Sequence, residues 1–179
     1  MTPITFNPWI GKDYEEYSFE GLKTLILGES HYGDTGNETF HYTEDVVKKH
    51  AITKSIAFFT KIAKSMHRLP ASRFLTRVEK EKFWHSVAFY NFIQQFVGEE
   101  PRKRPSLEQW RLSSQAFTEV ISRLKPNICV VFGQELWNHL PPSNTVYSED
   151  GFKTLGFDVG ASRDMLTGHV KHPSSRYFK

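Results

Sequence analysis

The fold is best predicted from residues 25–32, which read LILGESHY. An apolar run ends there in Gly28 and gives way to a polar cluster, as at the end of a buried strand that delivers reactive groups to the edge of a sheet. Residues 171–178, near the other end of the chain, read KHPSSRYF and form a second polar cluster after a strand-like run. Two such edges can build one site, so we expect the two clusters to meet.

Strand and helix patterns alternate along the rest of the chain. Residues 22–28, 87–93, 128–132 and 165–170 have strand patterns. Helical patterns cover residues 52–66, 74–83, 107–124 and 134–140, and Ser106 with Gln109 forms a capping box. Residues 147–159 resemble a surface excursion or hairpin. This alternation predicts an α/β protein, a three-layer α/β/α sandwich with a four-stranded, mainly parallel central sheet.

Length and composition favour a single compact domain that spans residues 1–179. The one cysteine, Cys129, lies in an apolar strand pattern and is expected to be a buried thiol, so a disulfide or a cysteine cluster within the chain is excluded. The net charge of +3 permits a polyanionic partner without requiring one. Neither a leader pattern nor a long apolar span is visible, and we expect a cytoplasmic monomer without a membrane segment.

Four motifs, taken in order, resemble the signatures of the uracil-DNA glycosylase superfamily. They are GESHY at residues 28–32, Asn91 at the end of an aromatic strand, LKPNICVVFG at residues 124–133, and HPS at residues 172–174. Residues 102–108, RKRPSLE, also resemble the Arg-Pro-rich loop of the iron-sulfur branch. The resemblance covers nearly the whole chain. It implies a uracil-DNA glycosylase-like domain that takes part in base excision repair and hydrolyses the N-glycosidic bond of a uracil-like or modified pyrimidine flipped out of single- or double-stranded DNA.

The first motif departs from the best-known branch of that superfamily. Ser30 stands where that branch carries a water-activating aspartate, whereas Glu29 matches the glutamate of the iron-sulfur branch. The cysteines that hold the iron-sulfur cluster are absent, so we expect neither a metal nor another cofactor. His31 replaces the usual proline, and Tyr32 matches the tyrosine that blocks a 5-methyl group.

The chemistry of base removal assigns a task to three of these residues. Glu29 is expected to orient water and to stabilise positive charge on the sugar. His172 is expected to donate a hydrogen bond to the departing base, on which negative charge develops. Asn91 carries a donor and an acceptor that match the edge of a pyrimidine. The structural alternatives are a solvated loop acid, a structural histidine and an asparagine that satisfies backbone groups.

Further residues are expected to bind the base or the DNA backbone. Phe40 or Tyr42 would stack on the extruded base, or would instead cover the core. Ser174 and Ser175 would hold a phosphate, unless they form a simple turn. The remaining candidates are basic or large side chains: Arg176 or Tyr177 would fill the gap left by the flipped nucleotide, and Arg102, Lys103 and Arg104 would bind phosphates, or form a solvated loop.

Two other classes of function stay open. A non-catalytic nucleic-acid-binding protein on the same fold is motivated by Ser30, the altered first loop and the few residues after His172. A metal-assisted hydrolase is the third class, because the GESH sequence at residues 28–31 superficially resembles a motif of erythromycin esterase-like proteins. His169 and His172 are spaced like metal ligands, although Pro173 argues against the helix that would align them.

Overall fold

The computed structural model describes residues 4–100, 103–149 and 151–175. Its sheet is centred on four parallel strands that lie in the order β3-β2-β4-β7. Their bounds are Ala88–Asn91 for β3, Thr24–Gly28 for β2, Ile128–Phe132 for β4 and Met165–Val170 for β7. The sequence predicts a strand in each of these four places, and the α/β class is confirmed.

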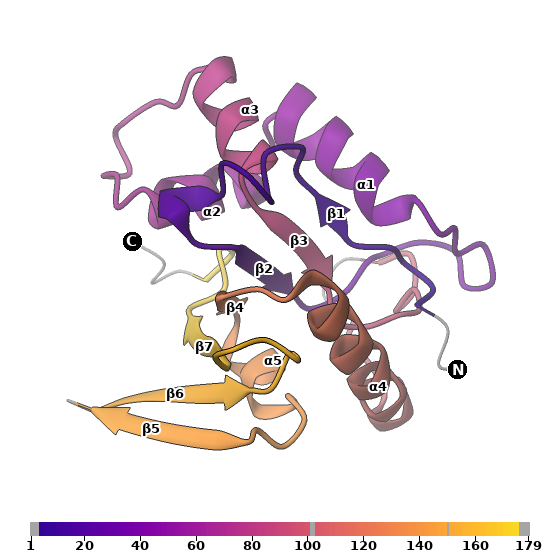
Figure 1. Ribbon diagram of the computed structural model, residues 1–179. Coiled ribbons are helices and arrows are strands. Elements are labelled where there is room, and N and C mark those ends of the chain that lie inside the picture. The colour runs from indigo at the N-terminus through magenta and orange to yellow at the C-terminus, as the bar shows by residue number, and fades with distance from the viewer. Residues whose placement is uncertain (1–3, 101–102, 150, 176–179) are drawn as a thin grey trace.

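The expectation of a four-stranded, mainly parallel sheet is wrong, because three more strands extend the sheet at its edges. β1 (Trp9–Ile10) pairs antiparallel with β3 at one edge. At the other edge β6 (Phe152–Phe157) pairs antiparallel with β7, and β5 (Thr145–Glu149) pairs antiparallel with β6. The sheet of the described residues therefore has seven strands and is mixed. The hairpin of β5 and β6 reaches away from the helices (Figure 1).

Five α-helices occur in the described part of the chain. They are α1 (Tyr42–Val46), α2 (Ala57–Met66), α3 (Arg77–His85), α4 (Leu107–Leu124) and α5 (Gln134–Asn138). A π-helical segment, Val47–Thr53, continues α1. The single helix predicted over residues 52–66 is interrupted, because Ser55 adopts a left-handed conformation with φ of 55°.

The helix starts follow from capping. Ser106 and Gln109 form the predicted capping box of α4, in which the Gln109 N–H donates to Ser106 Oγ at 3.2 Å. Thr76 and Glu79 form a second box, so α3 begins at Arg77 rather than near residue 74. The helix α4 ends at Lys125, which adopts the left-handed conformation before Pro126.

A hydrophobic core lies on each face of the sheet, because successive strand residues point to opposite sides. Leu25 and Val131 pack into the core that α4 and α5 cover, whereas Ile26 and Phe89 pack into the core of α2 and α3. Figure 1 shows α4 on one side of the central strands and α1 and α3 on the other. Cys129 is buried in β4, and this burial raises the pKa of its thiol.

None of the helices in the described ranges combines the length and the apolar character that crossing a membrane requires.

Candidate functional site

The candidate site lies beyond the carboxyl ends of the central strands. β2 lies between β3 and β4, so the chain goes from β2 to β3 on one side and then returns to β4 on the other side. In open parallel sheets, ligands bind where the strand order reverses in this way. Glu29 follows β2, Asn91 ends β3 and His172 follows β7. All three line one cavity of about 370 Å³, so the polar cluster after β2 and the polar cluster after β7 meet there.

The walls of this cavity, which we call the carboxyl-end cavity, are largely aromatic. The aromatic side chains that line it are Tyr32, Tyr42, Phe58, Phe59 and Phe89. The Phe58 ring lies 5.4 Å from the His172 ring, and the Tyr42 ring packs edge-on to His31. Flat apolar walls with a few polar groups suit a planar ring.

The predicted stacking residue Phe40 is not part of these walls. Phe40 is half exposed, packs against His41, and is absent from the residues that line the cavity. Tyr42, the second residue considered for stacking, is among them. Its hydroxyl donates to the Tyr32 carbonyl at 3.1 Å, which ties α1 to the first motif.

Asn91 is buried, and both hydrogens of its amide are engaged. Nδ2 donates to the Ser30 carbonyl at 3.0 Å and to His31 Nδ1 at 3.1 Å. The contact with a carbonyl fixes which end of the amide is nitrogen. A Cβ atom at position 28 would lie only 2.2 Å from Asn91 Oδ1, so Gly28 leaves the space that the Asn91 side chain occupies. Asn91 therefore offers a ligand only its oxygen.

His31 is a buried, neutral link between the sheet and α1. Because Nδ1 accepts from Asn91, the ring proton lies on Nε2, which donates to Thr43 Oγ1 at 2.9 Å. Burial lowers the pKa of His31 to about 3. His31 thus forms a hydrogen-bonded support between Asn91 at the end of β3 and Thr43 in α1.

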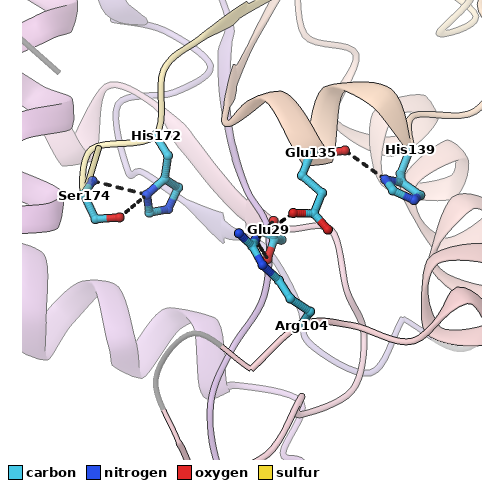
Figure 2. A network of polar contacts seen from close by, with 6 residues as sticks. All are labelled: Glu29, Arg104, Glu135, His139, His172 and Ser174. Atoms are coloured by element: carbon cyan, nitrogen blue, oxygen red, sulfur yellow. Dashed lines mark hydrogen bonds and ion pairs between the residues drawn. The ribbon is translucent and has the colours of Figure 1, made fainter. Parts of the chain in front are cut away.

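Glu29 shares an arginine with a second carboxylate. Arg104 Nη1 lies 3.4 Å from Glu29 Oε2 and 2.9 Å from Glu135 Oε2. Figure 2 shows the three side chains together. Burial raises the pKa of Glu29, Arg104 lowers it, and the charge of Glu135 raises it. Arg104, predicted as a phosphate ligand, is thus already paired with two carboxylates.

His172 is held in one tautomer by the residue two positions on. Ser174 N–H donates to His172 Nδ1 at 3.2 Å, and Ser174 Oγ lies 2.7 Å from the same nitrogen (Figure 2). Nδ1 is therefore an acceptor, and the ring proton lies on Nε2, on the side away from Ser174. Burial lowers the pKa of His172, with a further lowering from Arg104. Neutral His172 is thus a hydrogen-bond donor to the cavity.

A second, more polar cavity of about 630 Å³ adjoins the first, and both are lined by Glu29, Tyr32 and His172. Its other polar lining residues include Arg104, Glu135, Lys171, Ser174 and Ser175. The structure thus brings both predicted serines to the site. Lys103 is exposed and is not among the lining residues, whereas Arg102, Arg176 and Tyr177 lie outside the described residues.

Sequence reasoning missed two further polar groups of the site. Glu135 comes two residues after Gly133, the glycine that follows β4, and a chain position just past a strand was the available signal. His50 lines the carboxyl-end cavity, and its Nδ1 is buried without a partner in the described part of the chain. A buried polar atom of this kind is satisfied by a ligand or by water.

The described residues contain no group of three or more His, Cys, Asp and Glu side chains that could hold a metal ion. His169, one of the two histidines considered as ligands, instead contacts Gln134 Oε1 through Nε2 at 2.9 Å and stacks on Trp137.

No protein-family model matches this sequence, and no curated protein matches it.

Proposed function

We propose that this protein is a DNA glycosylase of the uracil-DNA glycosylase type, which hydrolyses the N-glycosidic bond of a uracil-like or modified pyrimidine flipped out of DNA. The observation that carries the proposal is the carboxyl-end cavity, which Glu29, Asn91 and His172 line together. Its volume of about 370 Å³ falls within the range of about 300 to 1,000 Å³ that is usual for small-ligand sites.

The aromatic walls support the binding of an extruded base. Enzymes that act on a base take it out of the stack and hold it between aromatic or apolar side chains. Phe58, Phe59 and Phe89 supply such surfaces here. The oxygen of Asn91 and the unpartnered Nδ1 of His50 are the groups with which this cavity would distinguish one base from another.

Glu29 and His172 would serve the two sides of the bond that breaks. Glu29 would stabilise positive charge on the sugar, a role that requires its carboxylate to be ionised. His172 would donate from Nε2–H to the base as it leaves with the bonding electrons. The Ser174 contacts support this role, because they keep the proton on Nε2 before the substrate arrives.

The adjoining polar cavity supports an approach of the DNA backbone from that side. Lys171 and Ser175 line it, and their ammonium and hydroxyl groups are of the kinds that bind phosphates. Such contacts would make affinity fall steeply with salt.

The test is to incubate the purified protein with a panel of oligonucleotides, each with one altered base, in single- and double-stranded form. Free base is detected by mass spectrometry, and abasic sites are detected by alkali cleavage. We expect one pyrimidine to be released and an abasic strand that remains uncut until alkali is added, since no lysine nucleophile is apparent in the motifs. Absence of released base from the whole panel would refute the proposal.

A non-catalytic nucleic-acid-binding protein is the second candidate, and one observation favours it. Both hydrogens of the Asn91 amide are engaged within the protein, so the donor expected to read a pyrimidine is already used. Salt-dependent binding of the same oligonucleotides without base release would support this candidate.

A further inference from the structure

We propose that Glu135 is a second catalytic carboxylate of this site and receives the proton of the attacking water. The inference rests on the proposed glycosylase activity and adds a residue that none of the sequence motifs contains. It starts from the shared contact of Glu29 and Glu135 with one nitrogen of Arg104.

The reaction requires two acidic groups with different tasks. A carboxylate that stabilises a sugar cation must keep its negative charge until the new bond has formed. If Glu29 took the proton of water, it would lose that charge at the moment when it is needed. A second carboxylate removes this conflict, as in glycoside hydrolysis, where two carboxylates flank the scissile bond.

The positions of the two carboxylates match this division. The Glu29 side chain is 16% exposed and lines both cavities, whereas the Glu135 side chain is 40% exposed and lines only the polar cavity. Glu29 thus lies toward the base and sugar, and Glu135 lies farther out, where its carboxylate is more exposed to solvent. Figure 2 shows Arg104 reaching the two carboxylates together.

Arg104 contacts both carboxylates in the free protein. Its guanidinium offsets the repulsion between two neighbouring carboxylates, and its side chain is 64% exposed. An arginine at this place is free to turn toward a phosphate of bound DNA, because arginine binds phosphate and carboxylate with the same donor fork. A shift of Arg104 away from Glu135 would leave that carboxylate available as a base.

The step balances as follows. The water oxygen forms a bond to C1′ of the sugar, and the bond between C1′ and the base nitrogen breaks. The base leaves with that electron pair, accepting a hydrogen bond from His172 Nε2–H. One proton of the water moves to Glu135, which later releases it to solvent.

The experiment measures single-turnover base release by Glu135→Gln and Glu135→Ala on the best substrate of the panel. We expect each variant to lose about a hundred-fold or more in rate, as is usual for the removal of a general base. Sodium azide needs no deprotonation, so it should restore the rate of Glu135→Ala and leave a sugar that carries azide, detected by mass. Sodium chloride at equal ionic strength is the control for salt. Glu119→Gln, on the exposed side of α4 and outside both cavities, should keep the parent rate.

A double-mutant cycle separates the proposed catalytic role of Glu135 from its role in holding Arg104. In the Arg104→Gln background, Glu135→Gln should still cost about a hundred-fold. If Glu135→Gln did not lower the rate in the Arg104→Gln background, the assignment would be overturned and Glu135 would have a positioning role at most. The same conclusion would follow if azide did not restore the rate of Glu135→Ala. A parent-like rate for Glu135→Gln would overturn it while the glycosylase proposal stands, whereas a parent protein that releases no base would refute both proposals.

Discussion

Cavities lie at both ends of the central sheet, and they differ in chemistry. The cavity at the amino ends of β2 and β3, which we call the amino-end cavity, has a volume of about 500 Å³, between the about 370 Å³ of the carboxyl-end cavity and the about 630 Å³ of the polar cavity beside it. Its lining includes the aromatic rings of Phe19, His67 and Phe83, which pack edge-on to one another. The strand ends deliver Glu29, Asn91 and His172 to the carboxyl-end cavity and none of them to the amino-end cavity. Cavity volume alone would not single out the carboxyl-end cavity, which is the smallest of the three.

The carboxylates at the two ends show the same contrast. At the amino end, Glu79 accepts from the Thr76 N–H and pairs with Arg73 at 2.6 Å, and the Thr76 contact lowers its pKa. At the carboxyl end, burial raises the pKa of Glu29 despite Arg104. A carboxylate that caps a helix is stabilised as an anion, so its pKa is lowered. Burial beside a cavity raises the pKa of a carboxylate, and such shifted pKa values are common at functional sites.

The largest expected effect separates these two acids. Glu29→Gln keeps the shape of the cavity but removes the charge that would stabilise the sugar cation, so base release should fall by about a hundred- to ten-thousand-fold while DNA binding persists. The matched variant Glu79→Gln should leave the rate unchanged. Single-turnover assays check both, and equal rates for the two variants would remove the distinction between the two ends.

The next effect compares two histidines. His172→Ala should lower the rate of base release by about a hundred- to a thousand-fold, because the departing base loses one preorganised donor. His67→Ala changes a residue that lines the amino-end cavity and should leave that rate at the parent value. A lower rate of base release by His67→Ala would mean that the amino-end cavity contributes to the reaction.

A pH profile sharpens the electrostatic side of the comparison. Arg104 lowers the pKa of Glu29, so Arg104→Gln should raise this pKa. Activity that needs ionised Glu29 would then be lost at a higher pH as the solution is acidified. The rate of base release between pH 4 and 8 measures this shift, with Arg73→Gln at the amino end as the control. If the acidic limb of the pH–rate profile of Arg104→Gln moved to lower pH, the result would contradict the contact between Arg104 and Glu29.

The smallest effect concerns stability. His31 is neutral in the fold, with a pKa of about 3 against 6.5 for an ordinary histidine. Below pH 6.5 only the unfolded chain takes up this proton, so the stability is present above that pH and is lost as the pH falls toward 3. His31→Gln should flatten the dependence of the free energy of unfolding on pH by up to about 1.4 kcal/mol per unit. Urea titrations at pH 4 to 7 measure this, and an unchanged slope for His31→Gln would contradict the neutral state of His31 in the fold.

β2, β3 and β4 were predictable because each is an apolar run that ends at or just before a glycine or a polar residue, whereas the pattern of β7 is weak. A hairpin was one of two alternatives for residues 147–159, where β5 and β6 form one, but its pairing with the sheet and the strand β1 were not predicted. β1 has two residues, too few to show any alternation, and β5 is largely exposed, so neither carries the signature of burial. The break at Ser55 was also hidden, because apolar residues on both sides of it keep a helical spacing although the backbone does not.

The convergence of Glu29, Asn91 and His172 followed from the rule that parallel strands meet at their carboxyl ends. The hydrogen-bond or ion-pair partner of each polar atom could not be predicted from the sequence. The engagement of Asn91 by His31 and of Arg104 by Glu135 depends on side chains far apart in the chain. Periodicity describes faces of strands and helices, but it does not say which groups pair across them.

The most direct measurement is the structure of the Glu29→Gln variant bound to an oligonucleotide that carries the preferred base. The account predicts that this base is extruded into the carboxyl-end cavity, against Phe58 and Phe59, with His172 Nε2 within hydrogen-bond distance of a base oxygen. A base that remains stacked in the DNA, or one bound in the amino-end cavity beside Phe19 and Phe83, would contradict it.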